Sequence, residues 1–301
     1  MRIIWLLCGI ITGAIGWQGF LAPQDQGDWP LPLIEWAIFF NAKEPFDRLI
    51  ARYQGDINHA TDQNYSLLWK AVVAADRLTC EDTANACSII DTLVNTRDAA
   101  LLNLDMQVAC PFSCALDLDL HSVITIFLEK IAKTPAQQLL FDRFLQGINT
   151  RGEPGLHRVF STGNIAIITK VLDMMSNKAL LNTLRDRDNE LPLARALEFE
   201  ESDALPIVEL LLSHRAQPTP AYQFASSPLA AALKKNRVVI ARKLLEEYSA
   251  EDLQIAMHTT DYCGSNILHY AVGCSSKMLV QEILHKLARP QDHVNVQNDR
   301  G

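Results

Sequence analysis

One short pattern recurs seven times along the 301 residues, and it restricts the fold more than any other feature of the chain. Each copy has an apolar anchor, with a small or apolar residue, usually alanine, three positions after it. Successive anchors lie 34, 44, 44, 37, 36 and 39 residues apart. Spacing of this size predicts a stack of repeated units. The anchors are Ile34, Leu68, Phe112, Leu156, Leu193, Leu229 and Leu268.

A second, more apolar segment follows many of these copies. Its apolar residues recur at spacings of three and four, which predicts a helix with one buried stripe. Neither helix of a copy can bury its stripe alone, so each pair is expected to become stable by stacking on the next pair. The sequence therefore predicts an all-α fold. The clearest second segments are residues 46–50, 165–175, 205–212, 238–245 and 278–287.

Two copies carry enough detail to suggest a family. Residues 261–271 and 186–196 resemble the ankyrin repeat, in which a finger Asp-x-x-Gly-x precedes Thr-Pro-Leu-His-x-Ala. The resemblance implies a solenoid of about seven helix pairs with short β-hairpin-like finger loops, covering residues 29–301. Tetratricopeptide and HEAT solenoids are the alternatives, and neither explains the finger. Partial matches are Leu156-His157 with Gly163-Asn164, and Asp56-Ile57-Asn58.

Residue choice within the copies agrees with this resemblance. A larger side chain than alanine three positions after the anchor would force stacked pairs apart. Gly264 and Asn189 tolerate the positive φ that a tight finger needs. Copies one to three match the pattern least, and copies two and three carry about ten extra residues each. Residues 294–301 resemble the opening of a further finger, so the last repeat is predicted to be incomplete, either in a fragment or as a closing finger. Prolines expected in a first helical turn are Pro32, Pro111, Pro192 and Pro228.

The first 22 residues are predicted to lie outside this fold. Met1-Arg2 precedes the uncharged apolar run 3–15, and small residues at Ala14 and Gly16 suggest cleavage after Gly16. This is the pattern of a signal peptide. The alternatives are a retained anchor over residues 3–22 and a buried core helix. Residues 23–28 are then a linker, and either of the first two interpretations places the repeats outside the cytoplasm, in the periplasm or beyond.

Cysteine usage is consistent with export. Cys8 belongs to the leader, and the six that remain are an even number, which favours disulfides in an exported chain. Cys80 and Cys87 bracket a short loop, and their bridge would stabilise the fold by about 2–3 kcal/mol. No pairing follows from the sequence for the other four, Cys110, Cys114, Cys263 and Cys274.

No catalytic, cofactor or metal motif occurs in the sequence. His157 and His269 occupy the histidine position of the repeat, where the resemblance implies a hydrogen bond to finger backbone. Lys and Arg number 27 against 35 Asp and Glu, a net charge of −8, which argues against nucleic acid as a partner. We therefore expect a non-enzymatic protein without cofactors, although a catalytic site assembled only in space is the weakest alternative.

The resemblance implies that a protein partner binds the concave side, formed by finger tips and the exposed face of the first helices. Aromatic residues among charges suit such a partner, and the negative charge favours a basic one. Phe39 and Phe40 have a second interpretation, as a cap on the end of the solenoid. The expected contact residues are Phe39, Phe40, Tyr65, Arg187, Asp188, Glu190, Glu198, Phe199, Phe224, Lys234, Lys235, Tyr262 and Ser265.

These observations favour a protein-binding scaffold in the bacterial envelope. A narrower version, by analogy with the family, is an inhibitor or immunity protein of a toxin acting in the same compartment. If residues 3–22 are retained in the membrane, the alternative is a membrane-anchored assembly factor.

Overall fold

The computed structural model describes residues 30–58, 65–77, 83–96, 102, 110–133, 135–149, 151–218, 227–261, 263–274, 276–287, 289–292 and 294–299. The chain forms two compact units, Met1–Lys130 and Ile131–Gly301. The predicted leader and linker lie outside the described residues. No helix within the described ranges is both long enough and apolar enough to cross a bilayer.

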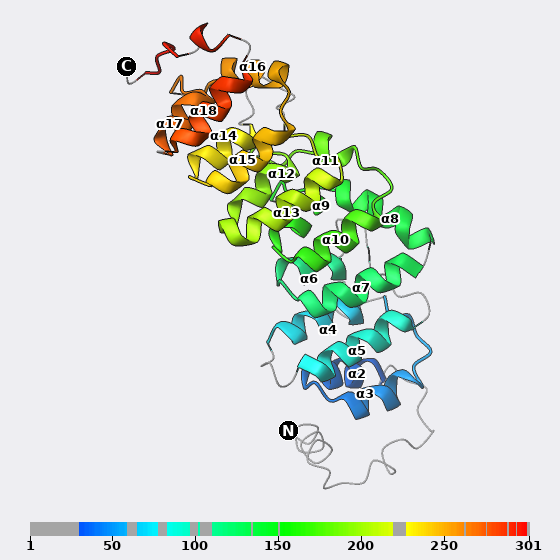
Figure 1. Cartoon of the computed structure of the whole chain (residues 1–301). Helices are drawn as coiled ribbons and strands as arrows, with labels where there is room; N and C mark the ends of the chain where they lie inside the picture. The colour runs from blue at the N-terminus through cyan, green and yellow to red at the C-terminus, as the bar shows by residue number, and fades with distance from the viewer. Residues whose placement is uncertain are drawn as a thin grey trace. The chain divides into compact units, whose positions relative to one another are not determined.

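Seven helix pairs follow the seven predicted copies, in chain order (Figure 1). The first helices are α2 (Pro30–Phe39), α4 (Leu67–Asp76), α6 (Pro111–Asp117), α9 (Gly155–Ser161), α12 (Pro192–Arg195), α14 (Pro228–Lys234) and α17 (Ile267–Gly273). Their partners are α3 (Lys43–Ile50), α5 (Thr83–Asn95), α7 (His121–Lys133), α10 (Ile165–Met174), α13 (Glu201–Ser213), α15 (Val238–Glu247) and α18 (Lys277–Lys286). The prediction of an all-α fold of repeated helix pairs is confirmed.

Additional helices lie between some pairs. The sequence did not predict α8 (Pro135–Gln146), α11 (Leu180–Thr183) or α16 (Ala250–His258). Helix α8 packs on α9, and α16 packs on α17 and α18. Within the described residues no strand occurs, and one isolated β-bridge joins Ile148 to Pro154. The described residues also include the 3₁₀ turns η2 (Ala196–Glu198) and η3 (Pro290–Asp292).

Pairs stack through corresponding helices within each unit. In the first unit α4 contacts both α2 and α6, and α3 contacts α5. In the second unit α12 contacts α9, and α14 contacts both α12 and α17. All seven anchors are buried, with Leu268 the most exposed at 8%. The residues three positions later are buried as well, so the predicted register is confirmed.

A residue seven positions after the anchor turns the chain between the two helices of four pairs. Asn41, Asp119, Gly163 and Asn236 all have positive φ there, between 54° and 62°. After the asparagine turn of the sixth pair, the next N–H reaches back to the carbonyl of Ala232 at 2.8 Å. This arrangement is a Schellman motif, and glycine, asparagine and aspartate are the residues that tolerate it best.

Finger loops precede three of the first helices and share one hydrogen-bond pattern. The Asp186 Oδ1 accepts from the backbone N–H groups of Asp188 and Glu190, each at 2.9 Å. Asp261 accepts in the same way from Cys263 and Ser265. The positive φ predicted at Asn189 and Gly264 is confirmed, at 62° and 71°. A third finger, missed by the sequence analysis, uses Asn149 to accept from Arg151 and Glu153, with Gly152 at the positive-φ position.

The structure places most of the prolines and cysteines that the sequence singled out. Pro111, Pro192 and Pro228 occupy the first turn of α6, α12 and α14, as expected. Cys87 is a free thiol in α5, but Cys80 lies outside the described residues, so their bridge stays a prediction. Cys263 and Cys274 are not bridged to one another; the Cys274 thiol donates to the Leu233 carbonyl at 3.0 Å.

Candidate protein-binding surface

The first helices expose a regular set of positions. Because each residue turns the α-helix by about 100°, the anchor and the residue three positions later face the core. The residues two and five positions after the anchor then point away from it. In α2 these are Trp36 and Phe39, and in α4 they are Lys70 and Val73. This side of the first unit is therefore rich in aromatic surface.

Three aromatic rings cluster on α2. Trp36, Phe39 and Phe40 are 42%, 56% and 47% exposed, high values for such large apolar side chains. Trp36 stacks on Phe40 with ring centroids 5.3 Å apart, and Phe39 meets Phe40 edge-on at 5.1 Å. These contacts fix the rings at the surface, which suits an aromatic binding site because little side-chain entropy remains to be lost on binding.

A second aromatic pair stands at the start of α4. Tyr65 stacks on Trp69 with centroids 3.9 Å apart, and both rings are half-buried. The Ser66 side chain caps the helix by accepting from the Trp69 N–H at 3.1 Å, which sets the helix start and the direction of the indole. Tyr65 was an expected contact residue, whereas Trp36 and Trp69 were missed.

The two helices enclose a groove of about 520 Å³, here named the aromatic groove. Trp36 and Phe39 line it from α2, and Trp69 and Val73 line it from α4. At its edge the Lys70 Nζ lies 2.6 Å from the Glu35 Oε1, so these two charges form an ion pair. Arg77 also lines the groove, at the end of α4, and its side chain is exposed.

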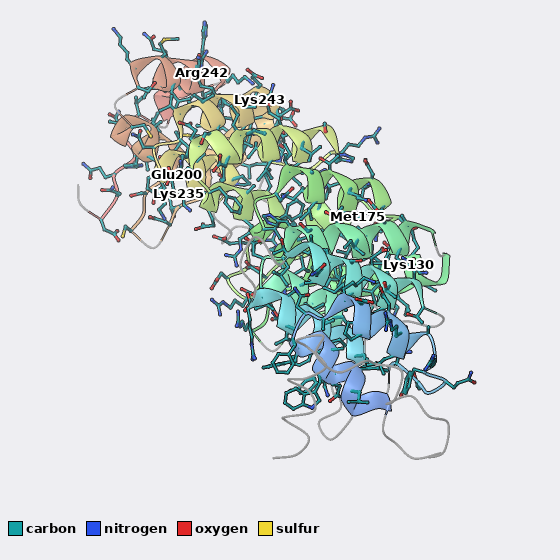
Figure 2. The ribbon with its side chains drawn as sticks, turned by 90° about the horizontal axis from the view of Figure 1, so that it is seen from below. Lys130, Met175, Glu200, Lys235, Arg242 and Lys243 are labelled. Atoms are coloured by element: carbon teal, nitrogen blue, oxygen red, sulfur yellow. The ribbon has the colours of Figure 1, made fainter. Side chains whose placement is uncertain are left out.

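The corresponding side of the second unit is polar, and many of its charges pair within the chain. Lys235 bonds Glu198 at 2.6 Å and the Leu197 carbonyl at 3.2 Å. Lys234 lies 3.8 Å from Asp261 and 5.2 Å from the ring centre of Tyr270. The labelled side chains of Glu200 and Lys235 belong to neighbouring pairs (Figure 2), and Glu200 bonds Arg237 at 3.2 Å. The expected contact residues Glu198, Lys234 and Lys235 are thus already paired within the chain.

Three of the expected contact residues do not behave as open surface. Ser265 is buried and accepts from the Asn298 amide at 2.9 Å, so its assignment to a binding surface was wrong. Glu190 is partly buried. Burial raises the pKa of its carboxyl, and the negative charges of Asp186 and Glu198 also raise it. Phe199 is half-buried, and the turn at Gly163 packs against its ring.

Of four other expected contact residues, two are exposed and two lie outside the described residues. Arg187 and Asp188 are exposed at a finger tip, where their charged groups lie 3.5 Å apart. Phe224 and Tyr262 lie outside the described residues. Of the expected first-unit aromatics, Phe39 lines the aromatic groove, whereas Phe40 and Tyr65 stack on Trp36 and Trp69, which line it.

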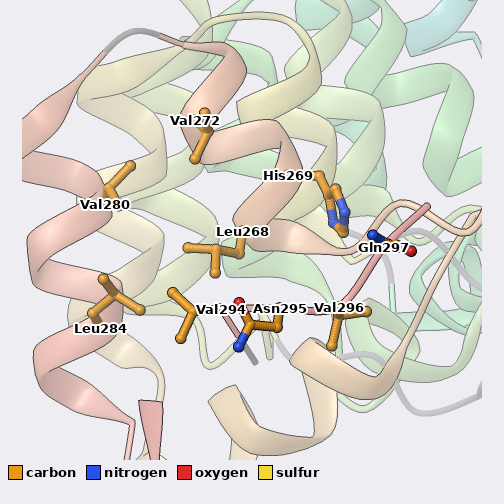
Figure 3. Close-up of a pocket in the computed structure, with 9 residues that line it drawn as sticks. All are labelled: Leu268, His269, Val272, Val280, Leu284, Val294, Asn295, Val296 and Gln297. Atoms are coloured by element: carbon orange, nitrogen blue, oxygen red, sulfur yellow. The ribbon is translucent and has the colours of Figure 1, made fainter. Parts of the chain in front are cut away.

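A second groove, of about 500 Å³, lies on the last pair (Figure 3). Leu268 and Val272 of α17 and Leu284 of α18 face Val294 and Val296 across it. Residues 298 and 299 lie against the preceding finger, where the Asp299 N–H donates to the Cys263 carbonyl at 2.9 Å. That this segment begins a further, incomplete repeat stays a prediction.

His157 connects two successive repeats and does not resemble a catalytic group. Its Nε2 lies 3.0 Å from the Glu190 carbonyl in the next finger, the hydrogen bond implied by the family resemblance. The side chain is fully buried, and Nδ1 has no hydrogen-bond partner among the described residues. His269 instead bonds its own helix cap, with Nδ1 2.7 Å from the Asn266 amide oxygen.

Acidification should therefore destabilise the second unit through His157. Burial lowers the pKa of this imidazole, so the unfolded chain, with an ordinary pKa of about 6.5, binds more protons than the folded chain below that pH. Stability present above about pH 6.5 is then lost as the pH falls toward the lowered pKa. Urea midpoints at neutral and mildly acidic pH would measure this loss, and His157→Gln should show a smaller pH dependence. An equal dependence in both proteins would contradict it.

Comparison with known proteins finds similar structures and no sequence relatives. The ankyrin repeat domain of Bcl-3, a unique member of the IkappaB protein family, is 16% identical over 92% of each chain, with a TM-score of 0.39. An ankyrin repeat protein from Leishmania major is 18% identical, over 86% of this chain and 82% of that one, with a TM-score of 0.46. No protein-family model and no curated protein matches the chain. These values are too low to carry a function from either structure.

Proposed function

We propose that this chain is a protein-binding scaffold whose contact surface is the exposed side of the first helices, centred on the aromatic groove. The observation that carries the proposal is the cluster of Trp36, Phe39 and Phe40, three large rings held rigidly and left exposed. Contiguous exposed apolar surface of this kind marks interaction sites, and tryptophan contributes strongly to binding energy.

The chemistry of the site favours binding over catalysis. Among the described residues, no group of His, Cys, Asp and Glu side chains could hold a metal ion. The groove contains one ion pair, one arginine and apolar walls, without a nucleophile placed beside a base. We therefore infer a non-enzymatic role that needs no cofactor.

We extend this proposal to the location and the biological role of the protein from its sequence alone. The apolar run 3–15 and the small residues before position 17 support export, with the anchored assembly factor as the alternative. If the protein is exported, a narrower proposal is that the scaffold inhibits a toxin acting in the same compartment. That the partner is basic rests on the net charge of −8, although Glu198 and Glu200 are paired within the chain. N-terminal sequencing of the purified protein would distinguish cleavage from anchoring.

A photo-crosslinking amino acid in place of Phe39 tests the contact surface. It should give a discrete protein adduct in extracts of the native compartment, because Phe39 lines the aromatic groove. The matched control is the same amino acid in place of Val239, which is 53% exposed on α15 of the other unit. Adducts from both positions alike, or from Val239 alone, would show that the aromatic groove is the wrong surface.

A further inference from the structure

Two of the rings that line the aromatic groove are each stacked on a neighbouring aromatic ring. Trp36 is stacked on Phe40 at an interplanar angle of 14°, and Trp69 on Tyr65 at 13°. Each indole therefore presents a ring that its neighbour holds in place. Fixed flat walls suit a ligand whose own surface is a series of rigid rings or ridges, because neither side then loses much conformational freedom.

Both indoles also bring a polar group to these walls. Neither the Trp36 nor the Trp69 Nε1–H makes a hydrogen bond to another described residue. A ligand that covers these donors without accepting from them would leave them unsatisfied, which weakens binding. The occupant must therefore combine apolar surface with accessible carbonyl oxygens.

An α-helical ligand fits this requirement poorly. Its backbone carbonyls are bonded within the helix, so only its last turn has acceptors to offer. A polyproline II segment has no internal hydrogen bonds, and all its carbonyls point outward. Aromatic-lined grooves are known to recognise proline-rich segments in this conformation.

The length of the groove and its charge restrict the choice of ligand further. The lining positions on the α4 side run from Trp69 to Arg77, about 12 Å along the helix, which about four residues of polyproline II would cover. Lys70 and Glu35 neutralise one another, whereas Arg77 makes no ion pair with another described residue. Among the described residues that line the groove, Arg77 is then the one charge without an ionic partner; its sequence neighbour Asp76 does not line the groove. A carboxylate on the ligand is the complementary group.

We propose that the aromatic groove binds a proline-rich segment of a partner protein in the polyproline II conformation, with an acidic residue next to Arg77. This inference rests on the proposed function, since it specifies the partner of the same surface. The proline rings pack between Trp36 and Trp69, and the segment's carbonyls accept from the two indole N–H groups.

Fluorescence anisotropy with the purified full chain tests the ligand class. The probe is a labelled peptide of about twelve residues with two Pro-x-x-Pro motifs and a glutamate at each end. The comparison peptide has alanine in place of every proline and therefore favours a helix. The proline peptide should bind at least about tenfold more tightly than the alanine peptide. Equal binding, or tighter binding of the alanine peptide, would overturn the inference.

Substitutions of groove residues test where the proline peptide binds. Trp36→Ala and Arg77→Glu should each weaken binding of the proline peptide by about tenfold or more. Trp69→Phe keeps a ring and removes the N–H, so it should weaken binding by a smaller factor and also serves as the variant least able to disturb folding. Arg52→Glu reverses another exposed charge of the same unit outside the groove and should leave binding unchanged. Binding that none of the groove variants alters would place the peptide elsewhere and overturn the proposal.

The two proposals fail in distinguishable ways. If peptides selected from a random library bind the groove but contain no proline, the proline-rich ligand is wrong and the scaffold function stands. If no peptide of the library binds the groove and the crosslinker at Phe39 gives no specific adduct, the groove is not a protein-binding surface and both proposals fail.

Discussion

Replacing Leu229 by alanine should lower the free energy of unfolding of the second unit by about 3–5 kcal/mol. Leu229 is fully buried in α14, and this helix packs against α12 on one side and α17 on the other. Because the neighbouring pairs hold both sides apart, the space left by the side chain cannot close. The loss should therefore include a cavity contribution as well as the transfer free energy of the missing carbons.

Leu268→Ala is the matched control, since it is the same change at the same position of the last pair. Leu268 is 8% exposed and already lines the open groove of about 500 Å³. Its removal enlarges that groove without making a closed cavity, so we expect a loss of only about 2 kcal/mol. Urea unfolding followed by circular dichroism would measure both losses. Equal losses, or a loss under about 1 kcal/mol at Leu229, would contradict the stacking of α14 between two pairs.

The repeat architecture could be predicted because its requirements act within single copies. The anchor and the small residue three positions later are set by helix geometry, and the turn residues are set by backbone φ. Helix α8 was missed although its signal is present: Leu140, Phe141, Phe144 and Leu145 have helical spacing. The ten or so extra residues of that copy are accounted for by this helix, which packs on α9.

The candidate site was only partly predictable. Phe39, which lines the groove, was expected, as were Phe40 and Tyr65, but the lining tryptophans Trp36 and Trp69 on which those two rings stack were not. Trp36 could have been found, because it stands two positions after the anchor Ile34 and must therefore point away from the core. Trp69 could not, because it occupies the repeat position at which His157 and His269 have structural roles. Its exposure depends on the stacking of α2 beside α4, which no local pattern encodes.

Paired charges were the least predictable feature of the surface. Glu198 and Lys235 lie 37 residues apart in sequence and 2.6 Å apart in the structure. Both residues were expected to contact a partner protein. The sequence of a single copy does not show which residue of the next copy will lie beside it, so this ion pair could not be predicted. An ion pair of this kind, half exposed on both sides, contributes little to stability, and it reduces the charge that either residue offers to a partner.

The fingers give a second large effect on stability, at Asp186. This buried carboxylate accepts from two backbone N–H groups, those of Asp188 and Glu190, each at 2.9 Å. Asp186→Ala leaves both donors without their acceptor, and we expect a loss of about 2–3 kcal/mol in the free energy of unfolding. The same finger presents the Glu190 carbonyl to His157, so its disorder would also weaken the link to the preceding pair.

Asp186→Asn is the control that the chain itself supplies. Asn149 makes the same two hydrogen bonds in the preceding finger, to Arg151 and Glu153, so an amide oxygen is sufficient for this geometry. The variant should therefore stay within about 1 kcal/mol of the natural protein, while Asp186→Ala does not. Urea midpoints of the three proteins at neutral pH would decide. If the alanine and asparagine variants lose the same stability, the negative charge of Asp186 stabilises this finger, and its role as a hydrogen-bond acceptor is secondary.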